Sequence, residues 1–308
     1  MTAPARTGHG ATGSPPARES AGRVLMIFLD GVGIGPLDPE RNPFARAKIP
    51  TLLTLTGEAT VVPLDATLGV AGTPQSGTGQ AALLTGTNAA ATFGGHFGPW
   101  TPVRLRPLVE ERSLLRRTVD AGRSVAFANA YPRGWPGPGG SRRIAGPPLA
   151  ARGAGVLDRH EEALGEGRAV SSEILNDGWK RHLGHAGLPD VTPERAGTNL
   201  AAIASDHDLT LYAHYATDTA GHRGRMEGAV AALERVDRFL AGVLDALPPG
   251  CTLVIASDHG NIEDVSMGHT LNPALGVVHG PGAGTMASGM RDLTDVAPAI
   301  LTRIGVEP

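Results

Sequence analysis

Aspartate and histidine side chains gather in two short segments of the C-terminal third of the chain. Asp258 and His259 directly follow a short apolar run, and His269 lies on the chain shortly after them. Further upstream, Asp218 and His222 have an i, i+4 spacing that can aim both side chains at one ion. A carboxylate and an imidazole at the end of a strand make poor core material and good ligands for a divalent metal. These segments therefore predict a metal site.

A further candidate ligand, Asp30, follows another apolar run near the start of the chain. All of these candidates offer oxygen or nitrogen and none offers a thiolate, which suits Zn²⁺ or Mn²⁺ better than Cu(I) or an iron–sulfur cluster. Six ligands are too many for one tetrahedral zinc ion but fit two ions. Two ions about 3.5–4 Å apart are the usual apparatus for displacement at phosphorus. The ligand set thus predicts two divalent ions and a phosphorylated substrate.

Ser76 is the candidate nucleophile for such a reaction. It lies in a Gln-Ser-Gly-Thr-Gly turn, and residues 80–85 after it have the pattern of the start of a helix. The N-terminus of a helix favours a phosphate, because backbone N–H groups and the positive end of the helix dipole face it. An ordinary helix N-cap is the alternative for Ser76, and Thr78 is the alternative nucleophile.

Short apolar runs predict the strands that position these side chains. The runs cover residues 23–29, 59–62, 124–128, 209–214, 251–256 and 275–278. Helical spacing occurs over residues 45–55, 108–121, 230–247 and 294–304. Strands that alternate with helices indicate a doubly wound, mostly parallel α/β sheet flanked by helices. Functional residues in such sheets gather beyond the carboxyl ends of the strands, where the candidate ligands are expected.

Composition divides the chain into a tail, a core and an insertion. Residues 1–22 are rich in Gly, Ala, Ser, Thr and Pro, lack the apolar stretch of a signal peptide, and indicate a disordered tail. Residues 132–193 are rich in Gly, Pro, Arg, Glu and His with weak periodicity, which indicates a small cap or insertion. We therefore expect the catalytic core in residues 23–131 and 194–308.

The overall composition favours a soluble protein of the cytoplasm. A hydrophobic content of 41% supports a substantial core, and a formal charge of −3 gives no basic surface for nucleic acid. No apolar stretch approaches the length of a membrane span. The single cysteine, Cys251, excludes a disulfide framework and a thiolate cluster, and we expect it to be a small buried hydrophobic residue.

Several of these segments resemble the motifs of a known family. Asp258-His-Gly-Asn with His269-Thr-Leu-Asn-Pro resembles the C-terminal metal motif of cofactor-independent phosphoglycerate mutase, and Asp218-Thr-Ala-Gly-His resembles its third metal motif. Asp30-Gly-Val-Gly and residues 42–52 resemble the N-terminal segment that this enzyme shares with phosphopentomutase. Both enzymes belong to the alkaline phosphatase superfamily, and the motifs of this chain stand in family order.

The resemblance covers most of residues 23–131 and 205–305 and implies a role for each ligand. One divalent ion would be held by Asp218, His222 and His269. The other would be held by Asp30, Asp258 and His259 together with the oxygen of Ser76, the nucleophile that forms a phosphoserine.

Two features depart from the resemblance. Gln80 stands where the mutases usually have a His after the Gly of the nucleophile motif. The middle of the chain is short, with about sixty residues that do not resemble the substrate-holding cap of either mutase. Because a short insertion makes water harder to exclude, we expect a phosphohydrolase acting on a small phosphate ester. A phosphomutase is the alternative, and a catalytically inert metal-binding protein is a third possibility.

Other polar residues are candidates for contact with the substrate. His96 lies in a Gly-rich loop that could reach the site and bind phosphate or donate a proton, and a purely structural role is equally open. Arg133, Arg142 and Arg143 could clamp a phosphate, since arginine suits bidentate contacts, or could form a solvated basic loop.

Overall fold

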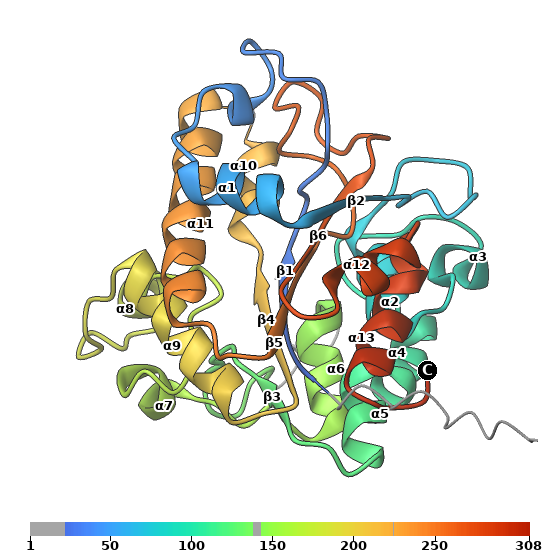
Figure 1. Ribbon diagram of the computed structural model, residues 1–308. Helices are drawn as coiled ribbons and strands as arrows, with labels where there is room; N and C mark the ends of the chain where they lie inside the picture. Colours follow the sequence, from blue (N-terminus) through green and yellow to red (C-terminus); the bar gives the residue numbers. More distant parts are fainter. Residues whose placement is uncertain (1–21, 138–142, 224) are drawn as a thin grey trace, which may run out of the picture.

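A six-stranded sheet runs through the computed structural model, which describes residues 22–137, 143–223 and 225–308 (Figure 1). The strand order is β2-β6-β5-β1-β4-β3. The four parallel strands are β5 (Cys251–Ala256), β1 (Arg23–Leu29), β4 (Leu209–His214) and β3 (Val125–Phe127). The remaining strand pairs are antiparallel and join β6 (Ala274–His279) to β5 and to β2 (Thr60–Leu64). The mostly parallel α/β sheet predicted from the sequence is confirmed, whereas residues 1–21 of the predicted tail lie outside the described residues.

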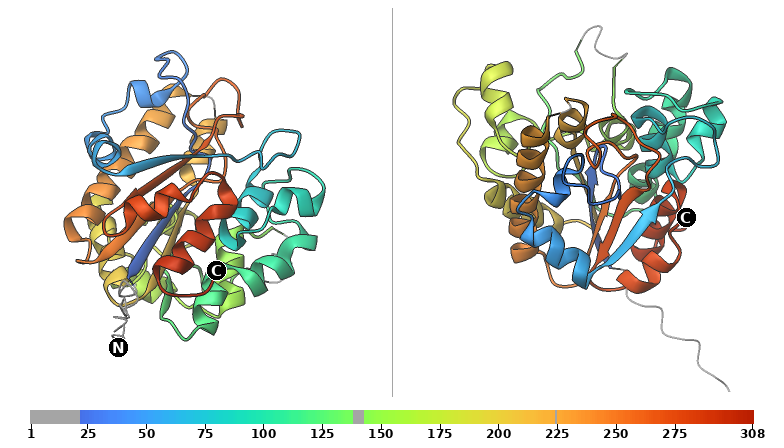
Figure 2. Two further views of the ribbon diagram at one scale, coloured as in Figure 1. Left: turned by 45° about the vertical axis from the view of Figure 1, so that its right-hand side comes forward. Right: turned by 90° about the horizontal axis from the view of Figure 1, so that it is seen from above.

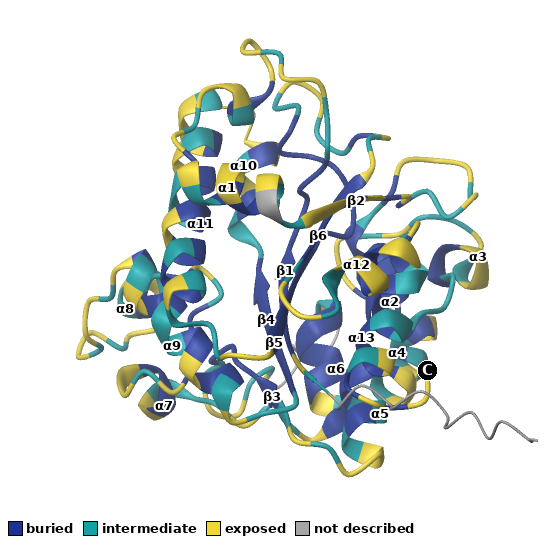
Figure 3. Cartoon of the chain, in the orientation of Figure 1, coloured by how far each residue is buried: buried dark blue, intermediate teal, exposed yellow. Residues whose placement is uncertain are grey.

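The central strand β1 is buried on both faces. Successive side chains of a strand point to opposite sides of the sheet, so an uninterrupted apolar run supplies two separate cores. One core receives Val24, Met26 and Phe28, and the other receives Leu25, Ile27 and Leu29. The central strands form the deeply buried layer of the molecule (Figure 3).

Helices cover both faces of the sheet (Figures 1 and 2). The face that carries Phe28 packs against α2 (Ser76–Thr85), α4 (Arg106–Arg112), α5 (Leu114–Asp120), α6 (Gly146–Ala154), α12 (Ala283–Ser288) and α13 (Val296–Arg303). The opposite face packs against α1 (Pro50–Glu58), α9 (Pro193–Ser205) and α11 (Met226–Ala246). Within the described residues, no helix combines the length and the hydrophobicity that crossing a membrane requires.

Some predicted helix boundaries are wrong, for local reasons. The segment 108–121 forms two helices, α4 and α5, because Ser113 adopts an extended backbone and its side chain caps α5 by accepting a hydrogen bond from the N–H of Arg116. The helix predicted from residue 45 begins at Pro50, where proline is tolerated in the first turn. The helix predicted after the Ser76 turn begins at Ser76 itself.

The segment 132–193 packs in two places. Its first helix, α6, lies in the main core against α4 and α5, with Leu149 and Ala150 fully buried. Its later helices, α7 (Glu161–Gly165) and α8 (Asp177–His182), form a smaller hydrophobic cluster around Trp179. That this segment acts as a cap stays a prediction.

Cys251 opens β5 and is 2% exposed, as a small core residue should be. Burial raises the pKa of its thiol to about 11, so little thiolate forms near neutral pH. We expect no reaction between the native protein and an aromatic disulfide reagent over minutes at pH 8. The chain unfolded in guanidinium chloride should release one equivalent of the coloured thiol at once. Prompt labelling of the native protein would contradict this burial.

Candidate metal centre

The predicted site residues lie together beyond the carboxyl ends of the central strands, although they are far apart in the sequence. Since β5, β1 and β4 are parallel neighbours, their carboxyl ends meet at one edge of the sheet. The site residues come from the end of β1 (Asp30), the start of α2 (Ser76), α10 (Ala216–His222; Asp218 and His222) and the loop between β5 and β6 (Asp258, His259 and His269).

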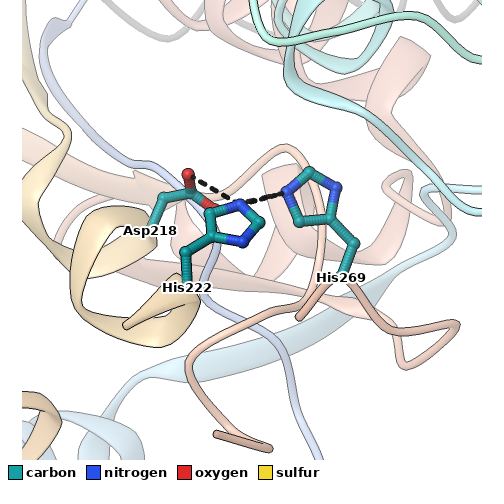
Figure 4. A group of neighbouring side chains, drawn as sticks. All are labelled: Asp218, His222 and His269. Atoms are coloured by element: carbon teal, nitrogen blue, oxygen red, sulfur yellow. Dashed lines mark hydrogen bonds and ion pairs between the residues drawn. The ribbon is translucent and has the colours of Figure 1, made fainter. Parts of the chain in front are cut away.

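A first group of possible ligands consists of Asp218, His222 and His269 (Figure 4). Their ligand atoms lie within 4.8 Å of one another. Nε2 of His222 is 2.9 Å from Nε2 of His269 and 3.4 Å from Oδ2 of Asp218. Nδ1 of His269 is 2.9 Å from the carbonyl oxygen of Pro74, which favours a proton on Nδ1 and leaves the Nε2 lone pair for a metal. The geometry of this group therefore suits a shared cation.

A second group consists of Asp30, Asp218 and His259. Nε2 of His259 is 3.4 Å from Oδ1 of Asp30 and 4.0 Å from Oδ1 of Asp218. The same nitrogen is 3.7 Å from Oδ2 of Asp258 and 3.0 Å from Oγ of Ser76. Asp218 thus lies between the two groups and is close enough to serve both, an arrangement that the sequence did not suggest.

Buried carboxylates in the second group and beside it, Asp30 and Asp258, make this a fitting place for a cation. Among the described residues, Oδ1 of Asp30 and Oδ2 of Asp258 are buried without a hydrogen-bond partner, which is unusual for polar atoms. Burial, reinforced by the charge of Asp258, raises the pKa of Asp30 well above its usual value, and burial also raises the pKa of Asp258. The donor atoms are oxygen and nitrogen, as Zn²⁺ or Mn²⁺ would require.

The same carboxylates act on His259. Burial by itself lowers the pKa of this imidazole, but the neighbouring charges of Asp258 and Asp30 outweigh burial and raise the pKa to about 10. The cluster therefore attracts positive charge, either as a proton on the imidazole or as a divalent cation. Since a metal ligand must give up its proton, cation binding here would release protons.

Two buried side chains to which the sequence analysis assigned no role, Asn261 and Glu263, organise the ligands. Asn261 donates a hydrogen bond from Nδ2 to Oδ1 of Asp218 at 2.6 Å. Glu263 accepts hydrogen bonds from the backbone N–H of Gly33 at 2.9 Å and from that of Asn261 at 2.8 Å. Glu263 therefore ties the loop after β1 to the loop after β5. Asn261 stood within the Asp258-His-Gly-Asn motif, whereas the only sequence signal for Glu263 was its place shortly after that motif.

Gln80 connects the second group to the rest of the core. Its Nε2 donates a hydrogen bond to Oδ2 of Asp30 at 3.1 Å, and its Oε1 accepts one from the backbone N–H of Gly146 at 2.9 Å. The side chain that departs from the mutase pattern therefore contacts a predicted metal ligand directly.

Ser76 is better placed than Thr78 to act as the nucleophile. Ser76 is 3% exposed and its Oγ faces His259. The hydroxyl of Thr78 instead lies 3.2 Å from the carbonyl oxygen of Gln75 and accepts a hydrogen bond from the N–H of Phe97 at 3.1 Å. These contacts give Thr78 a structural role in fixing the turn.

The other candidate contacts are engaged elsewhere or exposed. Nε2 of His96 is 3.1 Å from the carbonyl oxygen of Val70, a contact within the loops. Arg133 forms an ion pair with Glu162 at 2.8 Å on the surface. Arg143 is exposed, and Arg142 lies outside the described residues.

Gly31 allows the loop after β1 to pass directly over Asp218. Its φ is +66°, and a Cβ at this position would lie 2.6 Å from Oδ1 of Asp218. We expect Gly31→Ala to lower the free energy of unfolding by about 2–4 kcal/mol and to reduce metal content. Urea unfolding and elemental analysis would measure the two effects.

Gly69 provides a matched control for this substitution. Its φ is +68°, but nothing lies within 4 Å of the place that a Cβ would take. Gly69→Ala should therefore show only the backbone cost of about 1–2 kcal/mol, with metal content unchanged. Equal behaviour of the two variants would show that the close approach to Asp218 does not matter.

Proteins of known sequence resemble parts of this chain. Residues 191–308 match the family model of the metalloenzyme superfamily. A 2,3-bisphosphoglycerate-independent phosphoglycerate mutase from Ruegeria pomeroyi is 35% identical over 124 residues, which are 37% of this chain and 24% of the mutase. The corresponding mutase from Halobacterium salinarum is 35% identical over 156 residues, 44% of this chain and 30% of the mutase. The chain thus spans only about a quarter to a third of the length of these relatives.

Solved structures share the fold over nearly the whole chain. An alkaline phosphatase from the Antarctic bacterium TAB5 has a TM-score of 0.55 and 11% identity, with coverage of 93% of this chain and 98% of the phosphatase. A lipoteichoic acid synthase from Listeria monocytogenes has a TM-score of 0.57 and 10% identity, with coverage of 94% of this chain and 73% of the synthase. At such identities the likeness is one of fold. The family match of residues 191–308, the mutase relatives and the shared fold together support an alkaline phosphatase-like metalloenzyme.

Proposed function

We propose that this chain transfers the phosphoryl group of a small phosphate ester to water, with Ser76 as the nucleophile and two divalent ions, Mn²⁺ or Zn²⁺, as cofactors. One observation carries the proposal. The hydroxyl of Ser76 lies 3.0 Å from Nε2 of His259, inside the cluster of possible ligands and at the first residue of α2.

In the proposed reaction, Oγ of Ser76 attacks phosphorus and the bond to the leaving oxygen breaks, which gives a phosphoserine. The positive end of the α2 dipole favours the phosphate at this position. Divalent ions bound to the two groups would lower the pKa of the attacking hydroxyl and neutralise charge on the phosphoryl group. Attack of water on the phosphoserine then releases phosphate and restores the Ser76 hydroxyl.

Exposure of the first ligand group, in contrast to the buried Ser76, favours hydrolysis as the outcome. The side chain of His222 is 50% exposed, so water has access to the first ligand group. Transfer back to a second hydroxyl of the substrate requires that water be kept away from the phosphoserine. A phosphomutase remains the second candidate, because the two relatives described above are phosphoglycerate mutases.

A substrate screen tests the proposed function and separates the two candidates. The protein would be loaded with Mn²⁺ or Zn²⁺, analysed for about two ions per chain, and incubated with sugar phosphates, phosphoglycerates and an aryl phosphate. Released phosphate and isomerised ester would be measured side by side, with EDTA-treated protein as the control. We expect metal-dependent release of phosphate. Isomerisation without release would favour the mutase, and neither reaction from fully loaded protein would contradict both candidates.

A further inference from the structure

A pocket of ≈ 860 Å³ lies against α10, apart from the metal centre. Its size falls within the range of about 300–1,000 Å³ that is usual for small-molecule sites. The residues that α10 contributes to it follow a helical repeat, Ala216, Thr219 and Ala220, whereas the proposed ligands Asp218 and His222 lie on another face of the helix. None of the predicted site residues lines this pocket. The pocket is therefore a separate cavity that shares α10 with the metal centre.

Small and polar side chains form the body of the pocket. α11 presents Gly228, Ala231 and Ala232, which leave room for a ligand against the helix. Ser172 contributes a hydroxyl whose oxygen accepts a hydrogen bond from Nδ2 of Asn129 at 3.0 Å.

The charged side chains of the pocket are mostly cationic. It is lined by the arginines Arg181, Arg223, Arg225 and Arg235 and by the carboxylates Glu173 and Asp177. The guanidinium of Arg181 pairs with Asp177 at 2.6 Å. In the part of the chain that the structure describes, the other three arginines form no ion pair. Because guanidinium groups match carboxylate and phosphate geometry, this excess of arginine suits an anion.

We propose that this pocket binds a small organic anion that carries phosphate or carboxylate groups. Arg235 is half-buried and lies on α11, whereas Arg181 is exposed and lies on α8. Because the two arginines lie on different walls of the pocket, one ligand with two acidic groups could contact both. A single inorganic phosphate would leave most of the volume empty. The proposal does not rest on the hydrolase reaction, because the pocket contains none of the residues assigned to that reaction.

A binding experiment with 3-phosphonopropionate tests the proposal. This probe carries a phosphonate and a carboxylate, and it has no phosphate ester that the enzyme could hydrolyse. Calorimetric titration would be run on the metal-loaded protein and on protein stripped with EDTA and then desalted. We expect binding in both, because the pocket needs no metal. Binding that disappears completely in the stripped protein would place the anion at the metal centre and overturn the proposal.

Variants on two walls locate the bound probe. Arg235→Ala and Arg181→Ala should each weaken binding by about tenfold or more, as loss of a charged hydrogen bond does. Arg238→Ala is the matched control, because it removes the same charge from α11 at a residue that pairs with Glu194 outside the pocket. Arg181 is highly exposed, so its substitution should leave the fold intact even if Arg235→Ala does not fold. Unchanged binding in Arg181→Ala, or an equal loss in Arg238→Ala, would overturn the proposal.

Discussion

Replacement of Ser76 by alanine is expected to lower the rate of phosphate release by a factor on the order of 10³ or more, with the fold retained. The Oγ atom is the proposed attacking group, and alanine removes it without adding volume. The residue is the first of α2, and within the described residues its Oγ contacts Nε2 of His259, so we expect the loss of stability to be about 1–2 kcal/mol. Steady-state rates on the substrate found in the screen, together with circular dichroism, would measure both properties.

Thr78→Ala is the control for this substitution. Thr78 holds the turn through Gln75 and Phe97, so its loss should cost about 1–2 kcal/mol of stability but leave turnover measurable. Mass spectrometry of acid-quenched protein should find phosphate on the peptide that contains Ser76. If Ser76→Ala kept its activity while Thr78→Ala lost it, the two hydroxyls would have to exchange roles.

Replacement of Asp218 by asparagine is expected to reduce metal content in both ligand groups at once. Asp218 belongs to both groups of possible ligands, whereas His222 belongs to one. The metal content should therefore fall from about two ions per chain to below one in Asp218→Asn, whereas His222→Gln should retain about one ion per chain. Activity should fall on the order of 10²-fold or more in Asp218→Asn, since both ions act on the same phosphoryl group. Elemental analysis after dialysis and steady-state rates would check the two expectations.

Asp264→Asn makes the same chemical change in the loop that carries Asp258 and His259. The carboxylate of Asp264 accepts hydrogen bonds from Ser266 and belongs to neither ligand group. Its metal content and activity should match those of the unchanged protein. If Asp218→Asn kept two ions, the position of Asp218 between the groups would have no bearing on metal binding.

The sequence was informative where the chain is buried on two faces. The bounds of β4 and β5 were predicted residue for residue, because each strand is an apolar run that ends at a polar or turn residue. The antiparallel direction of β6 was not predicted, since a short apolar run looks the same in either direction. The break between α4 and α5 depends on the extended backbone at Ser113, and serine is common inside helical patterns as well.

The residue types and their places after predicted strands also allowed the members of the candidate site to be predicted from the sequence. All seven predicted residues lie at one edge of the sheet because parallel strands place their carboxyl ends side by side. The position of Asp218 between two groups could not be predicted, because it depends on how closely α10 approaches the loop after β5. The burial of Glu263 could not be predicted either, because its carboxylate accepts hydrogen bonds from backbone N–H groups, which leave no signal in the sequence.

α10 is only seven residues long, yet one of its faces carries Asp218 and His222 and another lines the arginine-rich pocket. Thermodynamic linkage gives this arrangement a quantitative consequence. If an anion in the pocket changes the affinity of the two groups for their ions by some factor, the ions must change the affinity for the anion by the same factor. A single coupling free energy, transmitted by α10, would then describe both the effect of the anion on metal binding and the effect of the metal ions on anion binding.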